Sequence, residues 1–133
     1  MMISTKGRYA VRVLVELARH DRSELIPLKE IAEGQGISLK YLESIMSLLA
    51  KNRLVEGASG KGGGYHLVRN PDEYTLLEIL KVTEGGIEPV ACGAVEGEGC
   101  DKLKECATYP VWKELSELIN DFLANKTLKD LLG

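Results

Sequence analysis

The chain has 133 residues, of which 44% are hydrophobic and 28% are charged. This length predicts a single domain with its own core, and the composition excludes a disordered chain. No run approaches the roughly 20 apolar residues that a membrane-spanning helix needs, and no charged-then-apolar leader begins the sequence. We therefore expect a cytoplasmic protein without a membrane partner.

The net charge of −3 hides a strong asymmetry between the two halves of the chain. Residues 1–70 carry 11 Lys and Arg against 7 Asp and Glu, whereas residues 71–133 carry 6 against 13. A basic first half and an acidic second half predict that an anionic partner binds the N-terminal half.

A first helix is predicted over residues 6–18. Ser4 or Thr5 can cap it, and apolar residues recur along it every three or four positions. The basic residues that fall outside this apolar stripe are Lys6, Arg8 and Arg12. They fit either a solvated face or contact with a phosphate backbone.

Two helices joined by a glycine-containing break follow. Pro27 opens a short helix over residues 28–33, and Ser38 caps a longer one over residues 39–52. This order predicts a helix-turn-helix, in which the first residues of the second helix point at base edges. Those residues are Ser38, Leu39, Lys40, Tyr41, Glu43 and Ser44. Ser38 can also serve as a helix cap and Tyr41 as packing, and these roles are compatible with DNA contact.

Residues 54–55 and 65–68 are typical of two short strands around a glycine-rich tip, a β-hairpin wing. The tip is not a phosphate-binding P-loop, because its glycine spacing is wrong and Gly62 stands where Ser or Thr must hold magnesium. A tip poor in side chains suits insertion along a DNA backbone or minor groove. The basic residues predicted to carry DNA affinity are Lys40, Arg53 and Lys61.

The last part of the chain predicts two more helices. Thr75 and Glu78 form a capping-box pattern for a helix that reaches residue 82 or 83, and Pro110 begins a helix over residues 110–124. The wide apolar stripe of this last helix predicts a homodimer interface, with packing against its own domain as the alternative. The predicted interface residues are Trp112, Leu115, Leu118, Ile119 and Phe122.

All three cysteines, Cys92, Cys100 and Cys106, lie in one segment between these two helices. The residues between them offer little apolar surface to bury, so a bound metal would explain how the segment is ordered. The spacing favours an iron–sulfur cluster over zinc, because structural zinc sites usually contain a closer cysteine pair. Zinc binding and thiol redox chemistry remain open on spacing alone.

Several stretches together resemble the iron–sulfur cluster regulator (IscR) family of bacterial transcription factors. These are residues 4–10 (STKGRYA), 37–43 (ISLKYLE) and 61–65 (KGGGY), followed by three cysteines and a long Trp-containing helix. The resemblance covers the chain in order. It implies a winged-helix dimer that carries a cluster, usually [2Fe–2S], on three cysteines that correspond to Cys92, Cys100 and Cys106. It also implies regulation of cluster-assembly genes.

The chain departs from the pattern of this family in specific ways. Members often supply a histidine three residues after the third cysteine, where this chain has Tyr109, and an arginine before the glycines of the wing, where it has Ser59. Carboxylates near the loop or from a partner chain could substitute as ligands: Glu96, Glu98, Asp101 and Glu105. Relatives that sense nitric oxide carry a [4Fe–4S] cluster and an acidic residue near position 8, where this chain has Arg8. Relatives that control cysteine metabolism lack the cysteines.

The predicted fold is mainly α. It has a winged helix-turn-helix domain over residues 1–83, a cluster-binding loop over residues 84–109, and a dimerisation helix with a C-terminal turn over residues 110–133. The predicted DNA contacts are Arg8, Ser38, Lys40, Tyr41, Glu43, Ser44, Arg53, Ser59, Lys61 and Gly62.

The predicted function is that of a homodimeric regulator, not an enzyme, that binds double-stranded DNA and is tuned by a [2Fe–2S] cluster. Cluster-assembly proteins are candidate partners. Two alternatives remain: a zinc-stabilised or thiol-redox-sensing repressor, for example of cysteine metabolism or of the nitric-oxide response, and an electron-transfer protein.

Overall fold

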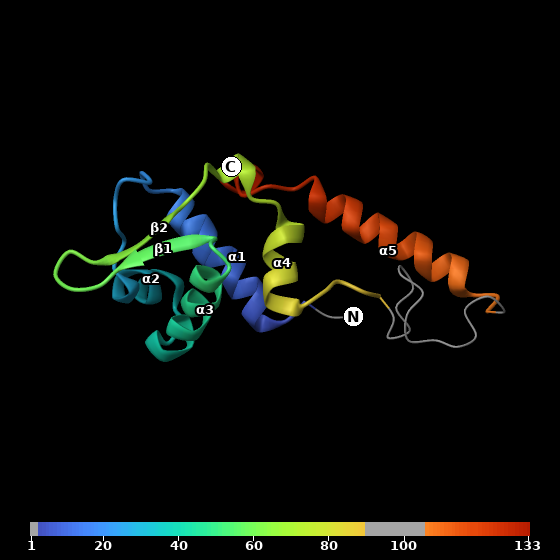
Figure 1. Cartoon of the computed structure of the whole chain (residues 1–133), viewed down its shortest axis with the longest axis horizontal. Coiled ribbons are helices and arrows are strands. Elements are labelled where there is room, and N and C mark those ends of the chain that lie inside the picture. Colours follow the sequence, from blue (N-terminus) through green and yellow to red (C-terminus); the bar gives the residue numbers. More distant parts are fainter. Residues whose placement is uncertain (1–2, 90–105) are drawn as a thin grey trace.

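A computed structural model describes residues 3–89 and 106–133 (Figure 1). Its elements, in chain order, are α1 Thr5–Ala18, α2 Leu28–Gln35, α3 Leu39–Lys51, β1 Val55–Ala58, β2 Gly64–Leu67, η1 Pro71–Glu73, α4 Leu76–Glu84, α5 Tyr109–Ala124 and η3 Lys129–Leu131. The prediction of a mainly α fold with a two-stranded wing is confirmed. In the described ranges no helix is both long enough and apolar enough to cross a membrane.

Side-chain caps fix where the two longest helices of the winged-helix region begin. The Ser4 hydroxyl accepts a hydrogen bond from the Gly7 amide at 3.0 Å, and Ser38 accepts one from the Tyr41 amide at 3.2 Å. Each bond satisfies one of the amides that a helix start leaves without a partner. Both caps lie where the sequence predicts them.

The capping box predicted at α4 forms only in part. The Thr75 hydroxyl accepts from the Glu78 amide at 3.1 Å, as expected. The Glu78 carboxylate does not return to Thr75, because it pairs with the Arg69 guanidinium, which also lies over the Tyr74 ring at 4.4 Å. The second half of a capping box is therefore exchanged for an ion pair that ties the end of the wing to α4.

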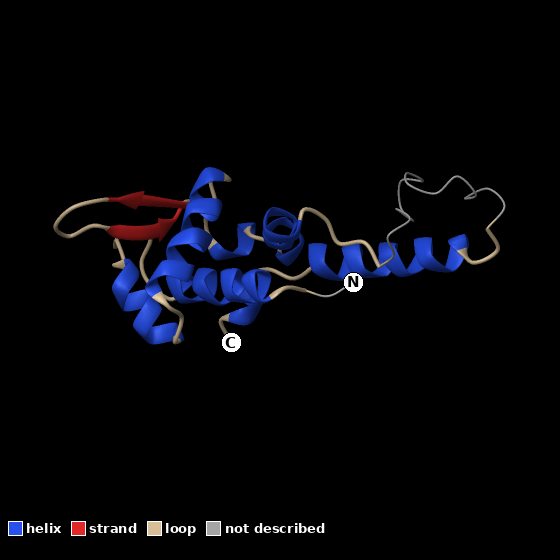
Figure 2. Cartoon of the chain, turned by 90° about the horizontal axis from the view of Figure 1, so that it is seen from below, coloured by secondary structure: helices blue, strands red, loops and turns tan. Residues whose placement is uncertain are grey.

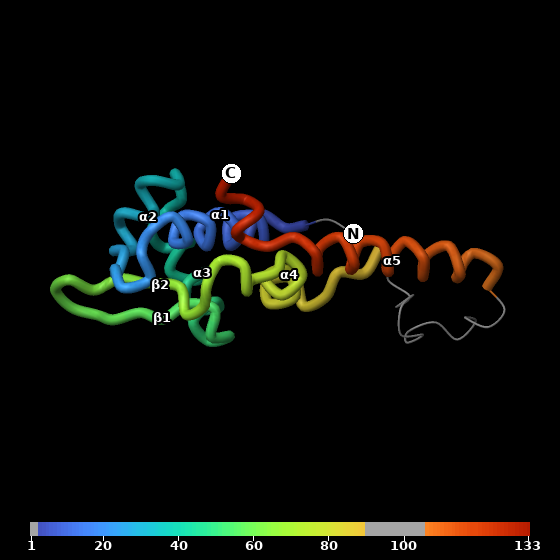
Figure 3. The backbone as a smooth tube through the Cα atoms, turned by 90° about the horizontal axis from the view of Figure 1, so that it is seen from above, coloured from blue at the N-terminus to red at the C-terminus, as the bar shows by residue number. Residues whose placement is uncertain are grey.

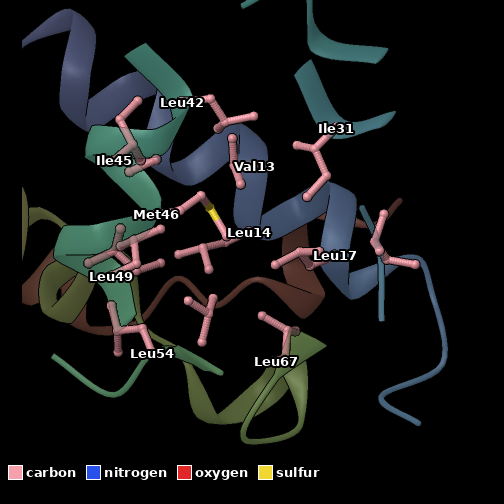
Figure 4. Close-up of a cluster of buried hydrophobic side chains, with 14 of the residues drawn as sticks. Val13, Leu14, Leu17, Ile31, Leu42, Ile45, Met46, Leu49, Leu54 and Leu67 are labelled. Carbon is pink, nitrogen blue, oxygen red and sulfur yellow. The ribbon is translucent and has the colours of Figure 1, made fainter. Parts of the chain in front are cut away.

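One hydrophobic core joins α1, the helix-turn-helix and the wing (Figure 4). The labelled side chains of this core are Val13, Leu14, Leu17, Ile31, Leu42, Ile45, Met46, Leu49, Leu54 and Leu67. Each such side chain contributes about 1.5–3 kcal/mol on burial. Because α3 buries this face, its opposite face points to solvent.

The turn between α2 and α3 is built by a glycine and an apolar plug. Gly36 has a φ of 66°, a left-handed conformation that favours glycine, and its amide donates to the Ala32 carbonyl. Ile37 follows and is 6% exposed. The chain can thus reverse within three residues and start α3 at Leu39, which produces the predicted helix-turn-helix.

The wing is an antiparallel pair in which Val55 faces Leu67 and Ala58 faces Gly64. A second, shorter pairing supports the wing, because Ile26 and Tyr65 exchange two backbone hydrogen bonds of 2.9 Å each. A side chain at Gly64 would collide with the Ile26 carbonyl, so this close approach requires glycine. The sequence did not predict this pairing.

The C-terminal residues return to the winged-helix core after α5. The Leu128 amide donates to the Tyr74 carbonyl at 3.1 Å, and the Leu76 amide donates to the Lys126 carbonyl at 2.9 Å. Leu128 itself is fully buried in the main core. The end of the chain therefore completes the N-terminal domain rather than continuing away from it.

Helix α5 extends from this domain as an arm, on the side opposite the wing (Figures 1 and 2). Its Leu123 packs in a small second cluster with Leu80 of α4 and with Ile87. Figure 3 shows that the rest of the helix runs beyond α4. Most of α5 therefore has few neighbours among the described residues.

Candidate nucleic-acid interface and cysteine site

The first turns of α3 expose the polar residues predicted to meet DNA. Ser38, Lys40, Glu43 and Ser44 are exposed, and Leu39 is 44% exposed. A helix start with exposed polar and apolar side chains offers both hydrogen-bonding groups and a surface for a thymine methyl group. The start of α3 thus has the chemistry of a recognition helix.

Tyr41 has the packing role that the sequence left open. It is half-buried, and its ring meets the Tyr9 ring edge-on at 5.9 Å and 85°. Its carbonyl accepts a hydrogen bond from the Ser44 hydroxyl at 2.7 Å. Tyr41 therefore joins α3 to α1 while part of its side chain stays open to solvent.

Arg53 follows α3 in an unusual backbone conformation. Its φ of 59° is left-handed, and it is the non-glycine residue with positive φ among the described residues. The Arg53 amide donates to the Ala50 carbonyl at 3.0 Å, and the Leu54 amide to the Leu49 carbonyl at 2.9 Å, which close the end of the helix. The exposed Arg53 side chain is thereby placed at the junction of α3 and β1.

The wing tip is a tight turn that presents one lysine. The Gly63 amide donates to the Gly60 carbonyl at 3.0 Å, with Lys61 and Gly62 as the central residues. Gly62 has a φ of 79°, which the third position of a type II turn requires. Ser59 and Lys61 are exposed. A positive charge thus projects at the end of a backbone that has almost no side chains.

The predicted basic residues of α1 lie in different environments. Arg8 is exposed and donates to the Thr5 hydroxyl of its own helix at 3.1 Å. Arg12 is also exposed, but it bonds to Gln35 of α2. Sequence periodicity could not distinguish them, because both fall on the polar side of one helix.

The described residues include one of the three predicted metal ligands. Cys92 and Cys100 lie outside the described residues. The Cys106 sulfur is partly exposed and lies 3.2 Å from the Thr108 hydroxyl, and hydrogen bonding to Thr108 lowers the pKa of the thiol. A lowered pKa favours the thiolate, which is the form that binds metals.

Cys106 lies three residues before Tyr109, the first residue of α5. The Tyr109 amide donates to the Cys106 carbonyl at 3.3 Å. Within residues 3–89 and 106–133, no group of three metal-binding side chains comes together. The described part of the chain thus contributes one thiol to the predicted site, at the outer end of the arm.

The apolar surface of α5 divides into two faces. Ile119 is half-buried against the second cluster, and Trp112 is also half-buried. Leu115, Leu118 and Phe122 are 39%, 62% and 59% exposed. The helix therefore packs on its own domain along one face and leaves Leu115, Leu118 and Phe122 exposed, and the homodimer interface stays a prediction.

Comparisons with known proteins agree with this architecture. The family model described as Rrf2, iron-dependent transcriptional regulator, matches residues 3–133. The HTH-type transcriptional regulator IscR of Pectobacterium carotovorum is 39% identical over 133 residues, which is all of this chain and 80% of the relative.

Two solved structures resemble the chain over nearly its whole length. The global cysteine regulator CymR of B. subtilis has 35% identity and a TM-score of 0.80, and the match covers 99% of this chain and 96% of that one. IscR of T. potens has 33% identity and a TM-score of 0.78, covering 99% and 86%. These relatives are transcriptional regulators.

Proposed function

The chain belongs to the Rrf2 family of winged-helix transcriptional regulators, and from this premise we propose that it is a homodimer whose promoter binding is tuned by a [2Fe–2S] cluster. The proposed targets are genes of iron–sulfur cluster assembly. The observation that carries the proposal is that all three cysteines lie in the segment that connects the winged-helix domain to α5.

The DNA interface of this proposal consists of the start of α3, the wing tip and basic residues around them. Lys40, Arg53 and Lys61 are exposed there, and the half of the chain that contains them is basic. Such residues neutralise phosphates and supply affinity for any duplex, while side chains at the start of α3 select the sequence.

The cluster would be held by Cys92, Cys100 and Cys106. The donor chemistry fits, because soft thiolates are the usual ligands of iron–sulfur clusters, and hydrogen bonding already lowers the pKa of the Cys106 thiol. A bound [2Fe–2S] cluster supplies a redox-active group that oxidants can remove. The residues of this chain would then transmit its presence, since Cys106 lies three residues before α5 and the chain enters the main core at Leu128, after that helix.

The homodimer is supported by the uncovered face of α5. Leu115, Leu118 and Phe122 are exposed on α5, which extends as an arm with few contacts to the other described residues. A second copy that packs the same face would bury these side chains, and symmetric dimers are the commonest closed assemblies. Such a dimer would present two winged-helix domains to one stretch of DNA.

A second candidate is a regulator of cysteine metabolism that senses thiols without a cluster. The likeness to CymR favours it as strongly as the likeness to IscR favours the first, because the two TM-scores differ by only 0.02. A third candidate is a DNA-binding repressor with the same fold, in which zinc stabilises the structure. The cysteine-rich segment favours the cluster, since three cysteines lie within 15 residues.

One set of measurements distinguishes these candidates. Protein purified without oxygen should show visible charge-transfer absorption, and the Cys106→Ser variant should lose it; a colourless wild type that contains zinc would contradict the cluster. Genomic fragments captured with and without the cluster should then include different promoters. Identical fragment sets in both states would contradict tuning by the cluster.

A further inference from the structure

We infer that Arg12 is a positioning residue that fixes the recognition helix against α1 and α2, rather than a residue that binds phosphate. The inference rests on the DNA-binding function proposed above. The Arg12 guanidinium forms two hydrogen bonds with Gln35. Its Nε donates to the Gln35 side-chain oxygen at 3.1 Å, and its Nη2 donates to the Gln35 carbonyl at 2.6 Å.

These two bonds hold the end of the first helix of the helix-turn-helix. Gln35 is the last residue of α2, and the last carbonyls of a helix have no partner within it. A cation at this end also interacts favourably with the helix dipole. The Gln35 amide group donates in turn to the Glu16 carboxylate at 3.2 Å, so two residues of α1 clamp the end of α2.

The same guanidinium also reaches toward α3 through two aromatic rings. Its Cζ lies 5.2 Å from the centre of the Tyr9 ring, within the range of a cation–π contact. Tyr9 meets Tyr41 edge-on, and Tyr41 lies in the first turn of α3, where its amide is capped by Ser38. A chain of contacts thus runs from Arg12 to the residues proposed to face the bases.

This geometry distinguishes Arg12 from the other basic residues proposed to meet DNA. Two of its donor nitrogens bind Gln35 and its plane lies near a ring, whereas Arg8 bonds only within its own helix turn. Lysine keeps the charge of arginine but lacks the planar fork and stacks less well. Arg12→Lys therefore removes the clamp and leaves the net charge unchanged.

The test compares two duplexes, one selected from random sequences by the wild-type protein and one of scrambled sequence. We expect Arg12→Lys to weaken binding to the selected duplex about tenfold, the effect of losing one hydrogen bond to a charged group. Binding to the scrambled duplex and the dependence of affinity on salt should stay at wild-type values, because the number of neutralised phosphates is unchanged. Arg19→Lys is the matched control and should match wild type with both duplexes, because Arg19 is exposed at the C-terminal cap of α1 and its ion pair with Glu16, at 3.8 Å, is one that lysine can also form.

A role in phosphate binding predicts the opposite pattern. Arg12→Lys would then bind both duplexes like wild type, and Arg12→Ala would weaken both and lower the salt slope by about 0.9; this result would overturn the inference. A purely structural role would lower the melting temperature without changing the ratio of the two affinities, which also overturns it.

A measurement without DNA tests the same geometry. In amide NMR spectra, Arg12→Lys should shift the Gln35 and Tyr41 signals, and Arg19→Lys should not; unshifted signals in Arg12→Lys would overturn the inference. A wild type that selects no duplex would contradict the proposed function together with the inference. A wild type that binds while Arg12→Lys binds equally would overturn the inference alone.

Discussion

Arg53 combines a charge proposed for DNA binding with a backbone conformation that disfavours its side chain. A left-handed conformation costs a residue with a Cβ roughly 1–2 kcal/mol, and glycine avoids this cost. Arg53 has a φ of 59° at the end of α3, and glycine would be the more stable residue at this position. A functional requirement for the cation would explain this.

We therefore expect Arg53→Gly to raise the free energy of unfolding by about 1 kcal/mol and to weaken DNA binding at the same time. Arg53→Ala is the matched control, because it removes the charge but keeps the strained backbone; it should weaken binding without any gain in stability. Urea unfolding and DNA titration measure the two effects. Unchanged affinity in both variants would show that Arg53 does not contact DNA.

Lys61 offers a test of the wing that does not depend on the target sequence. It is exposed at the second position of the turn closed by Gly60 and Gly63. Lys61→Ala should weaken binding to all duplexes and lower the salt slope by about 0.9, the value of one phosphate contact. If affinity and slope both keep their wild-type values, the wing does not touch DNA.

Tyr109 lies three residues after Cys106, where the resemblance to the iron–sulfur cluster regulator family implies a histidine. We expect Tyr109→His to slow the loss of visible absorbance in air, because imidazole is a good ligand for iron. Tyr109→Phe should leave the rate nearly unchanged, and changing any one cysteine should abolish the absorbance. Faster bleaching in Tyr109→Phe would show that the phenol is itself a ligand or a necessary support.

At the scale of elements, α5 is the part of the structure that most needs a partner. Leu115 and Leu118 are exposed on one face, whereas Ile119 packs on the second cluster of its own chain. Substitution of Ile119 would therefore mix loss of the dimer with loss of the fold. Leu115 and Leu118 are the cleaner pair to change.

The variant Leu115→Asp with Leu118→Asp should be a folded monomer, because charges cannot be buried unpaired at an apolar seam. Lys113→Asp is the control, since Lys113 lies two residues from Leu115 and about 200° around the helix. It should remain a dimer. Sedimentation velocity measures the assembly, and circular dichroism checks the fold; a dimer in the double variant would contradict the proposed interface.

The elements themselves could be predicted because local signals determine them. Ser4, Ser38 and Thr75 cap their helices as the sequence indicates, and the glycines of the wing mark its turn. Contacts distant in sequence could not be predicted, because periodicity shows which face is apolar but not what covers it. The pairing of Ile26 with Tyr65 and the Arg12–Gln35 bonds are of this kind.

Contacts distant in sequence also limited what could be predicted of the candidate site. Exposure of Lys40 and Lys61 follows from their place on a polar helix face and a turn, so sequence was sufficient for them. It was not sufficient for Tyr41, whose half-burial depends on Tyr9 of a different helix. The conformation of Arg53 also depends on context, since it is set by how α3 ends against the wing.

At the scale of the whole molecule, α4 and the residues after α5 contact the same domain, although the cysteine segment separates them in sequence. The chain leaves the winged-helix domain after α4 and returns to it at Leu128, which hydrogen-bonds to Tyr74. Tyr74 in turn is fully buried, and its hydroxyl donates to the Leu54 carbonyl at 2.6 Å and accepts from the Val68 and Arg69 amides. The C-terminus is thus linked to the base of the wing through one buried side chain.

This link predicts that the DNA-binding domain and the C-terminal residues unfold together. Leu128→Ala should lower the free energy of unfolding by about 2–5 kcal/mol, the usual cost of a cavity in a packed core. Leu131→Ala is the matched control, because Leu131 is 40% exposed; it should cost less than about 0.5 kcal/mol.

In urea, circular dichroism should report the helices, and the fluorescence of Trp112, the one tryptophan of the chain, should report α5. We expect the two signals to change at one midpoint and to shift together in Leu128→Ala. Separate transitions, or a stable fragment of residues 1–83, would show that the winged-helix domain folds independently of the C-terminal residues.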